Sequence, residues 1–336
     1  MSLFHDVIQS EDNRPAMSGI GVKTLFVYLA SVIRAWVFLK WILRKFRPEV
    51  LFGGWIQRDG FVCALSNYHP FLLMPWGSDA LILPFRNRIL RIASSFVIQK
   101  ADKITCDAEE VKKTLLGLVR RSPDDIVVFP WGVEHEIFNV SITGNEIRRK
   151  LGWEDKIIVI NTRGFDLEYD PMTLVGILPN LCISHPELRV IMCGAGELEE
   201  ECREFVNSHG LGPVVHFAGY VSQEQLAQYY AAADIFVSCA LSDGTSIALL
   251  EAMTMGLPVV ITEIPAIMEW IASGYNGLFF TPGNGRQLQS HLELIIGDKE
   301  LRERFSKRNR EIAVKRADWE INYGKLETIF QDLTSG

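Results

Sequence analysis

Residues 235–260 of this chain, IFVSCALSDGTSIALLEAMTMGLPVV, decide its fold class. The β-branched apolar run that opens the stretch predicts a buried strand, and the apolar residues from Ile247 to Met255 recur with helical spacing. Gly256 and Pro258 end that helix, and a second apolar run begins at Pro258. A strand, a helix and another strand in this order indicate two parallel strands joined by a crossover. The stretch therefore predicts an α/β fold with a parallel sheet.

The same alternation extends over the C-terminal half of the chain. Further helical patterns occupy residues 197–208 and 223–232. The strand candidates are Ile157 to Asn161, Arg189 to Cys193, Val214 to Phe217, Ile235 to Cys239, Pro258 to Thr262 and Leu278 to Phe280. Strands and helices repeated in this way predict a doubly wound parallel sheet of the Rossmann type.

The N-terminal half shows a less complete version of the pattern. Its strand candidates are Val50 to Phe52, Phe71 to Met74, Lys103 to Thr105 and Ile126 to Phe129. A polar stretch through Thr143 and Asn145 places a boundary near residue 150, with an N-terminal Rossmann-like domain at 1–149 and a C-terminal one at 150–317. Two such domains are expected to face a cleft at the carboxyl ends of their strands, where open α/β sheets bind ligands.

Composition limits the possible functions. The chain has 336 residues, of which 48% are hydrophobic and 22% are charged, as in a globular protein of one large or two medium domains. The net charge of -7 argues against nucleic-acid binding, which requires clustered cations. The cysteines form no C-x-x-C pair, which favours reduced thiols in a cytoplasmic protein. They are Cys63, Cys106, Cys182, Cys193, Cys202 and Cys239.

The N-terminus offers one ambiguous segment. The first twenty residues are polar and carry Asp6, Glu11 and Asp12, so we expect no secretory signal. The apolar run 24–43, interrupted by charged residues, is open to three interpretations: a membrane-spanning helix, a buried helix that leads into the first strand, or a helix lying on a membrane surface. The third would give a peripheral membrane contact through residues 24–47 and place a cytoplasmic protein at the inner face of the membrane. Its cations would be Lys40, Arg44, Lys45 and Arg47.

The loop at 242–246 predicts an anion site. Its residues favour helix N-caps, and the backbone N–H groups of Gly244, Thr245 and Ser246 are free at the start of the helix. Free amides and the positive end of the helix dipole suit a diphosphate, although a capped helix without a ligand has the same sequence. Glu251 adds a second signal, because it lies within an otherwise apolar helical run. A buried carboxylate needs hydrogen-bond donors, either the hydroxyls of a ribose or an internal Arg.

This region resembles the retaining glycosyltransferases of family 4, which have the GT-B fold. Their donor motif is two acidic residues separated by seven others, followed by a helix and then Gly and Pro. Asp243 and Glu251 have this spacing. The resemblance covers about residues 100 to 320. It includes Pro130-Trp131-Gly132-Val133, Cys193-Gly194-Ala195-Gly196 and Asn276-Gly277-Leu278.

The resemblance implies a donor site in the C-terminal domain. It places Glu251 on the ribose, Asp243 near hydroxyls of the donor sugar, and the amides of residues 244–246 on the phosphates. Arg163 falls on the diphosphate-binding Arg of the family and would stabilise the leaving group. Phe217, Gly219 and Tyr220 match the stretch that lines the base pocket, while ordinary packing at a strand end is the alternative for them.

The resemblance also implies an acceptor site in the N-terminal domain. Trp76-Gly77-Ser78-Asp79 is similar to the family's His-Gly-Ser-Asp. Trp76 replaces the His, and an indole can stack on a sugar but cannot act as a base. Asp79 is either an acceptor-side group or a helix cap.

The implied chemistry is transfer with retention from a UDP- or GDP-type sugar to a hydroxyl acceptor. The acceptor would be a glycan, a lipid-linked molecule or a protein, in the synthesis of cell-envelope glycan or glycolipid. No cofactor, metal or side-chain nucleophile is expected, and the sequence has no Asp-x-Asp motif. The family's C-terminal helix, matched here by residues 318–336, returns to the N-terminal domain.

The chain departs from the family pattern in three ways. Glu168 replaces a usual Lys, Trp76 replaces the His, and the first strands with their glycine-rich loop have no counterpart, which predicts a reduced N-terminal sheet. A nucleotide-sugar-binding protein without catalytic activity is therefore the alternative to an active transferase. An NAD-dependent enzyme is less favoured, because Gly194 and Gly196 lack the third glycine of a dinucleotide fingerprint.

Overall fold

The computed structural model describes residues 22–335 of the chain, so the polar leader with Asp6, Glu11 and Asp12 lies outside the described residues. The chain divides into two compact units. Unit 1 comprises residues up to Thr105, Leu115–Val127 and the C-terminal residues from Phe330. Unit 2 comprises Cys106–Thr114 and Val128–Ile329. Each unit contains a parallel sheet, as the sequence predicts.

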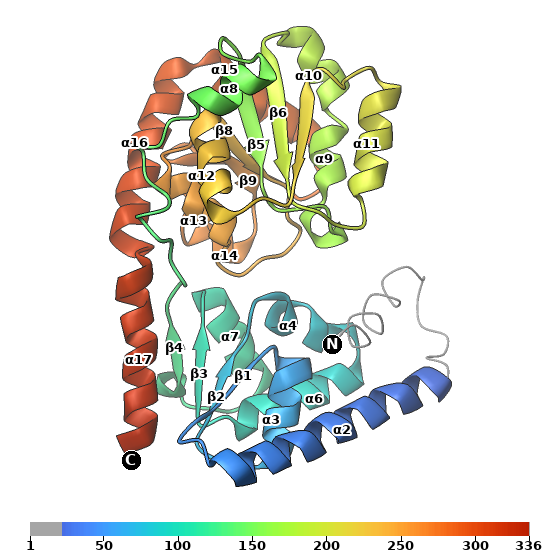
Figure 1. Ribbon diagram of the computed structural model, residues 1–336, viewed down its shortest axis with the longest axis vertical. Helices are drawn as coiled ribbons and strands as arrows, with labels where there is room; N and C mark the ends of the chain where they lie inside the picture. Colours follow the sequence, from blue (N-terminus) through green and yellow to red (C-terminus); the bar gives the residue numbers. More distant parts are fainter. Residues whose placement is uncertain (1–21, 336) are drawn as a thin grey trace. The chain divides into compact units, whose positions relative to one another are not determined.

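Unit 2 contains a six-stranded sheet in the order β10-β9-β8-β5-β6-β7 (Figure 1). Its strands are β5 (Ile157–Asn161), β6 (Leu188–Cys193), β7 (Val215–Gly219), β8 (Ile235–Ser238), β9 (Val259–Thr262) and β10 (Gly277–Phe280). All neighbours pair in parallel. The six predicted strands of this half are thus confirmed. Strands β8, β9 and β10 are buried along their whole length, as in a sheet covered on both faces, whereas β7 at one edge of the sheet is mostly half-buried.

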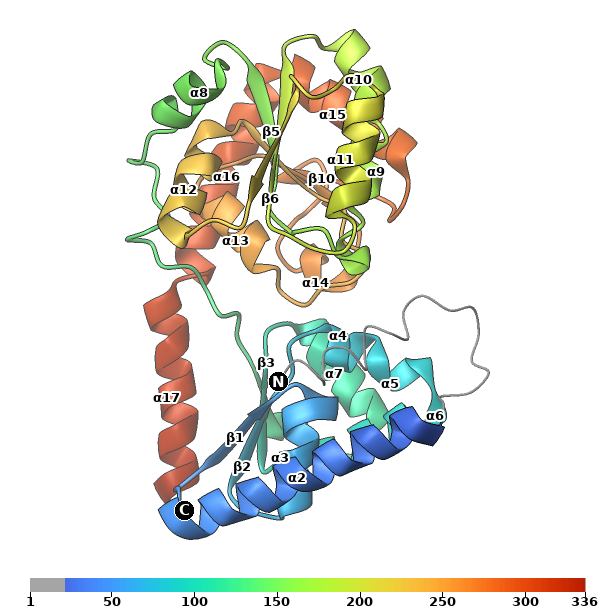
Figure 2. The ribbon, with the colours of Figure 1, turned by 45° about the vertical axis from the view of Figure 1, so that its right-hand side comes forward.

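Helices cover both faces of this sheet (Figure 2). They are α8 (Asn145–Leu151), α9 (Pro171–Val175), α10 (Leu178–Ser184), α11 (Glu199–Ser208), α12 (Gln223–Ala232), α13 (Ile247–Thr254), α14 (Pro265–Met268), α15 (Gly285–Gly297) and α16 (Lys299–Arg316). Ile158 and Ile160 of β5 pack with α12 and α13 in one core, whereas Val159 packs with α9 to α11 and α15 in the other. This alternation along β5 confirms the doubly wound arrangement.

Unit 1 contains a four-stranded parallel sheet in the order β1-β2-β3-β4. Its strands are β1 (Leu51–Gly54), β2 (Phe71–Met74), β3 (Lys103–Cys106) and β4 (Ile126–Val128). Its helices are α2 (Val22–Phe46), the π-helix η1 (Ile56–Gly60), α3 (Phe61–Ser66), α4 (Ser78–Leu81), α5 (Leu83–Arg86), α6 (Arg88–Lys100) and α7 (Glu109–Leu118), whose first residues belong to unit 2. The four strands predicted in this half are confirmed.

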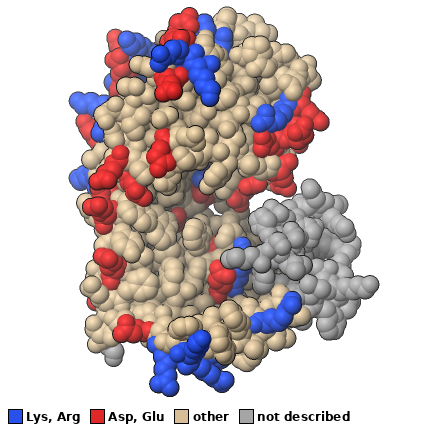
Figure 3. Space-filling model, in the orientation of Figure 1, with Lys and Arg blue, Asp and Glu red and all other residues tan. Residues whose placement is uncertain are grey.

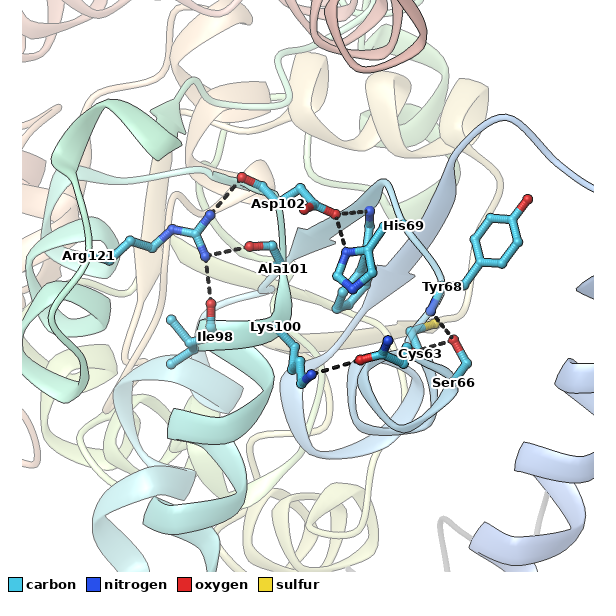
Figure 4. Close-up of polar contacts among 11 residues, drawn as sticks. Cys63, Ser66, Tyr68, His69, Ile98, Lys100, Ala101, Asp102 and Arg121 are labelled. Carbon is cyan, nitrogen blue, oxygen red and sulfur yellow. Dashed lines mark hydrogen bonds and ion pairs between the residues drawn. The ribbon is translucent and has the colours of Figure 1, made fainter. Parts of the chain in front are cut away.

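A polar cluster joins the carboxyl end of α6 to the neighbouring strands of unit 1 (Figure 4). The Arg121 guanidinium donates to the carbonyl oxygens of Ile98 and Ala101 at 2.7 and 2.6 Å and to that of Asp102 at 2.7 Å. The Asp102 carboxylate in turn accepts from Phe71 N at 2.6 Å and lies 2.8 Å from His69 Nδ1. These contacts satisfy helix-end carbonyls, so we assign the cluster a structural role.

Helix α2 is partly buried. Val32 and Leu43 are in the core, and Trp36 Nε1 donates to Leu65 O of α3 at 3.0 Å. Other large apolar side chains of α2 remain exposed. Among residues 22–335, no helix has the length and apolarity needed to cross a membrane. The interpretation of this segment as a membrane-spanning helix is therefore wrong. The interpretation as a buried helix holds for one face of α2 but not for the face that remains exposed.

The segment after β4 packs with unit 2. Val133 and Phe138 lie in the same core cluster as Ile158, and Val133 N donates to Ala317 O at 2.7 Å. The structure thus assigns residues 128–149 to unit 2, whereas the sequence predicted a boundary near residue 150. The last helix, α17 (Trp319–Ser335), begins in unit 2, and from Phe330 onward its residues belong to unit 1.

Candidate functional site

Charged side chains gather at the carboxyl ends of β5 and β8 in unit 2. Arg163 follows β5 and Asp243 follows β8, and their Nη2 and Oδ2 atoms lie 2.7 Å apart in a largely buried ion pair. The Arg163 guanidinium also stacks 4.3 Å from the centre of the Tyr169 ring. Parallel strands bring their carboxyl ends to one edge of a sheet, so residues 80 positions apart in the sequence meet here.

Glu251 is buried in the second turn of α13 and is held by Tyr230 of α12. The Tyr230 hydroxyl donates to Glu251 Oε2 at 3.0 Å. The same hydroxyl lies 2.7 Å from Thr162 Oγ1 and 3.1 Å from Ala248 O. Neither alternative predicted for Glu251 describes this contact, since its partner within the protein is a tyrosine and not an Arg.

Burial controls the protonation of both carboxylates. Loss of solvation raises the pKa of Glu251 to about 7, against the opposing effects of the Tyr230 hydrogen bond and the Arg163 charge. Loss of solvation likewise raises the pKa of Asp243, although Arg163 and hydrogen bonds from Ser246 and Gly244 act to lower it. Perturbed carboxylates gathered at the ligand-binding edge of a sheet indicate a functional site.

Two buried nitrogen atoms beside this cluster lack a partner among the described residues. They are Asn161 Nδ2, on a side chain only 1% exposed, and Arg163 Nε. Asn161 Oδ1 accepts from Arg163 N at 3.1 Å, which leaves the amide of Asn161 as an unused donor. Buried donors are almost always paired in folded proteins, so these two atoms are available to an acceptor on a ligand.

The structure does not leave the loop amides as open as the sequence suggests. Thr245 N donates to Asp107 Oδ2 at 2.9 Å, and both residues belong to unit 2. Gly244 N donates to the Asp243 carboxylate. Ser246 caps α13, as predicted, because its Oγ accepts from Leu249 N at 3.3 Å. Carboxylates of the protein thus occupy two of the three amides predicted for phosphate.

The predicted base-pocket residues lie at the end of β7. The Phe217 ring packs 5.8 Å from the Phe165 ring and is covered on another side by the Arg203 guanidinium. Gly219 has a φ of +68°. Tyr220 is 91% exposed and therefore has no packing role. The alternative of ordinary packing thus describes Phe217 but not Tyr220.

Two glycines bring the loops after β5 and β6 together. A Cβ on Gly196 would lie 2.5 Å from the backbone carbon of Phe165, and one on Gly194 would lie 2.8 Å from Gly164 Cα. Phe165 N donates to Ala195 O at 3.2 Å, which ties the two loops by their backbones. The glycines thus position the loop that carries Arg163.

Glu168 occupies the position where the family usually has a Lys, so this position adds no positive charge beside Arg163. Loss of solvation raises the pKa of Glu168, and the nearby charge of Asp243 adds to the shift.

Among residues 22–335, no group of three or more His, Cys, Asp or Glu side chains has an arrangement that could hold a metal ion.

The acceptor-side residues lie in unit 1, at the carboxyl end of β2. Both Asp79 carboxylate oxygens accept backbone amides, Oδ2 from Ile56 and Oδ1 from Trp76, each at 2.8 Å. Burial raises the pKa of Asp79 to about 6. Backbone amides thus hold both oxygens of Asp79, which lies inside α4 and is not its N-cap, since the N-cap is Gly77. Trp76 is 59% exposed, whereas Gly77 is buried and Ser78 begins α4.

Sequence reasoning missed four residues of this geometry: Tyr230, Thr162, Asn161 and Asp107. Each of them either lies far in the sequence from the motif residue that it contacts or is of a residue type that is common at its position. Asn161 alone had a local signal, as an amide side chain that ends an apolar strand.

Unit 2 belongs to the class of Rossmann-type α/β proteins, because it has a doubly wound parallel sheet with charged side chains at the carboxyl ends of its strands. The chain belongs to the group 1 glycosyl transferases, whose family model matches residues 144–312. This confirms the family 4 resemblance predicted from the spacing of Asp243 and Glu251.

Known proteins agree with this assignment. A sulfoquinovosyl transferase of Arabidopsis thaliana is 28% identical over 236 residues, which are 69% of this chain and 44% of the relative. A phosphatidylinositol N-acetylglucosaminyltransferase subunit of Saccharomyces cerevisiae is 26% identical over 194 residues, 58% of this chain and 42% of the relative. The matches thus span less than half the length of these curated relatives.

A crystal structure of Anabaena HepE in complex with UDP-glucose has the same fold. It superposes with a TM-score of 0.76 at 19% identity and covers 88% of this chain and 81% of that chain. The GT-B fold predicted from the sequence is therefore confirmed.

Proposed function

We propose that this chain is a retaining glycosyltransferase that moves a sugar from a UDP- or GDP-type donor to a hydroxyl acceptor. One observation carries the proposal. Glu251, Arg163 and Asp243 form a buried charged cluster next to unpartnered donors of Asn161 and Arg163. A nucleoside diphosphate sugar has phosphate oxygens for those donors and ribose hydroxyls for the carboxylate.

Each side chain has a distinct role in this proposal. Glu251 accepts from the ribose hydroxyls, and Arg163 stabilises the charge that develops on the departing diphosphate. Asp243 lies within reach of Arg163 and orients hydroxyls of the donor sugar. Because attack and departure occur on the same face of the sugar, no side-chain nucleophile is required, and the configuration is retained.

A lipid-linked hydroxyl is the acceptor class that we propose. The name of the yeast relative includes phosphatidylinositol, and α2 of this chain exposes apolar and basic side chains together. A peripheral membrane contact through residues 24–47 would bring a cytoplasmic transferase to such an acceptor, in the synthesis of glycolipid or cell-envelope glycan.

A nucleotide-sugar-binding protein without transferase activity is the second candidate. It is favoured by Asp79, whose two carboxylate oxygens are occupied by backbone amides, and by Trp76, which cannot act as a base. Glu168 in place of a Lys lowers the positive charge available for a diphosphate. The observations on Asp79 and Trp76 concern the acceptor side and transfer, whereas Glu168 bears on the diphosphate of the donor.

Calorimetric titration of UDP, GDP and their sugars into the protein tests the donor assignment. Glu251→Ala removes the proposed ribose acceptor and should weaken donor binding about 10- to 100-fold, at ~1.5–3 kcal/mol for a hydrogen bond to a charged group. Glu224→Ala, which removes an exposed carboxylate of α12, should leave binding unchanged. Equal affinity for Glu251→Ala and the parent would overturn the assignment.

Analysis of the reaction product separates the two candidates. An active enzyme should hydrolyse the donor or transfer its sugar, and NMR should show the anomeric configuration of the donor in the product. Donor binding with neither reaction would favour the second candidate.

A further inference from the structure

Helix α2 presents a continuous apolar and basic face to solvent. Ile33, Val37 and Trp41 follow one another at a spacing of four residues and are 58%, 54% and 52% exposed. Arg34 and Lys45 are exposed on the same side of the helix, and Lys45 Nζ lies 4.9 Å from the centre of the Trp41 ring. Exposed large apolar side chains that form a stripe indicate an interaction surface.

A second exposed patch lies on α5 and the start of α6. Phe85, Ile89 and Ile92 are 58%, 77% and 61% exposed, and they alternate with the exposed residues Arg88 and Arg91. The patch borders a groove of about 760 Å³ that is lined by these Phe, Ile92 and Arg side chains together with Phe96. No feature of the donor site involves these residues, which belong to unit 1.

Both patches rest on α3. Trp36 of α2 donates to Leu65 O, and the Phe96 ring of α6 packs edge-on against the Phe61 ring at 6.1 Å. Figures 1 and 2 show α2 lying across α3, with α6 beside α3. Helix α3 thus contacts both α2 and α6, the helices that carry most of the two patches.

The three helices carry a strongly one-sided charge. Helices α2, α5 and α6 contain nine Lys and Arg residues and no Asp or Glu, although the whole chain has a net charge of -7. Figure 3 shows one group of cationic side chains at the lower edge of the view, over the carboxyl end of α2. Such segregation in an acidic protein predicts an anionic partner.

We propose that the exposed faces of α2, α5 and α6 together form one docking surface for an anionic lipid bilayer. The surface pairs large apolar side chains with cations, which is the chemistry of a helix that lies at the lipid–water interface. A nucleic acid would use the cations but leave the isoleucines and Phe85 in water. The patch on α5 and α6 is a second anchor beside the membrane contact expected from residues 24–47. The proposal rests on the proposed function in one respect, namely that the acceptor is lipid-linked.

Vesicle co-sedimentation tests the docking surface in the absence of any sugar substrate. The full chain should bind phosphatidylcholine vesicles that contain phosphatidylglycerol and bind pure phosphatidylcholine vesicles much more weakly. Equal binding to both, or binding to neither, would overturn the proposal. Binding to heparin or duplex RNA in place of the anionic vesicles would identify a soluble polyanion as the partner and would also overturn it.

Paired variants test the α5–α6 patch. Arg88→Gln with Arg91→Gln should lower partitioning about 25-fold, at roughly fivefold for each cation near an anionic surface. Arg304→Gln with Lys307→Gln removes two exposed cations from α16 of unit 2 and should leave partitioning within about twofold of the parent.

Apolar variants test both anchors. Phe38 of α2, beside Trp41, is 60% exposed. Ile89→Ser with Ile92→Ser, and separately Phe38→Ser with Trp41→Ser, should each lower binding at least about tenfold. Ile183→Ser with Ile321→Ser removes equally exposed isoleucines from unit 2 and serves as the control. If only the α2 variant lost binding, the two-anchor surface would be wrong. UDP titration of every variant should match the parent, which separates a failure of docking from a failure of the donor assignment.

Discussion

At the scale of single residues, the buried carboxyl group of Glu251 affects stability and is also the group that we propose to contact the ribose. Its pKa is raised from 4.5 to about 7 by burial, so the folded protein retains a proton that the unfolded chain has already released. Stability from this group is therefore present below about pH 4.5 and is lost as the pH rises toward 7. The loss amounts to about 3 kcal/mol over that interval, as an order of magnitude.

Glu251→Gln should remove this pH dependence. The amide cannot ionise, so the variant should gain stability relative to the parent as the pH rises between about 4.5 and 7. Urea unfolding at both ends of the interval measures the difference. A difference that does not change with pH would show that Glu251 titrates normally in the folded protein.

Tyr230→Phe should shift the pH dependence of donor binding. The carboxylate form of Glu251 is the better acceptor for ribose hydroxyls, so donor affinity should rise as the pH passes through about 7. The Tyr230 hydroxyl, 3.0 Å from Glu251 Oε2, stabilises that form, and its loss should move the midpoint to higher pH.

Tyr229→Phe is the matched control, because its hydroxyl on the same helix lies 3.3 Å from His216 Nε2 and does not contact Glu251. Donor titrations across the pH range give both midpoints. A lower affinity for Tyr230→Phe with an unchanged midpoint would indicate a packing role alone.

The sequence could predict Glu251 but not its partner. A Glu within an apolar helical run must be buried and paired, which local pattern shows directly. Tyr230 lies 21 positions earlier and looks like an ordinary core aromatic of α12, so only the packing of α12 beside α13 reveals the contact. For the same reason, the Asp107 carboxylate on Thr245 N could not be predicted from the loop sequence.

At the scale of elements, the loops after β5 and β6 depend on the close approach at Gly196. A Cβ there would lie 2.5 Å from Phe165 C and 2.7 Å from Asp166 N, both backbone atoms that follow Arg163 in the chain. Gly196→Ala should therefore displace the Arg163 loop and weaken UDP binding at least about tenfold, with a stability loss of about 1–3 kcal/mol.

Gly212→Ala controls for the methyl group itself, since no atom lies within 4 Å of a Cβ at that position. Calorimetry and thermal unfolding of both variants provide the comparison. Parent-like UDP affinity in Gly196→Ala would show that the loop can shift without moving Arg163 out of place.

The strands were predictable because most of them are short apolar runs, and β2, β8, β9 and β10 are buried along their whole length, as in a parallel sheet covered on both faces. Helix α2 was not, because its apolar content is divided between a face on α3 and a face in solvent. Hydropathy along the sequence gives only the total apolar content of the helix. A spanning helix, a buried helix and a helix on a membrane surface were therefore all compatible with it. Val32 is buried and Ile33 is exposed to solvent, although they are neighbours in the sequence.

At the scale of the whole molecule, charge is divided unevenly along the chain. The net charge of the chain is -7 and that of α2, α5 and α6 together is +9, so the remaining residues carry -16. An anionic bilayer attracts the three helices and repels the remainder, which favours one orientation of unit 1 on the surface. The apolar side chains of the docking surface then enter the interface only in that orientation.

Transfer to a lipid acceptor in anionic vesicles should consequently depend on salt, whereas donor binding should depend on it much less. Raising the salt from about 0.1 M to about 1 M shortens the screening length from about 10 Å to about 3 Å, which weakens the attraction between exposed cations and the bilayer. Arg163, the proposed diphosphate ligand, is largely buried, and mobile ions screen buried charges poorly. We expect transfer to fall at least about tenfold while the UDP dissociation constant changes about twofold or less. Transfer rates on vesicles and UDP calorimetry across the salt series measure the two responses, and equal salt sensitivity of both would contradict docking through charge.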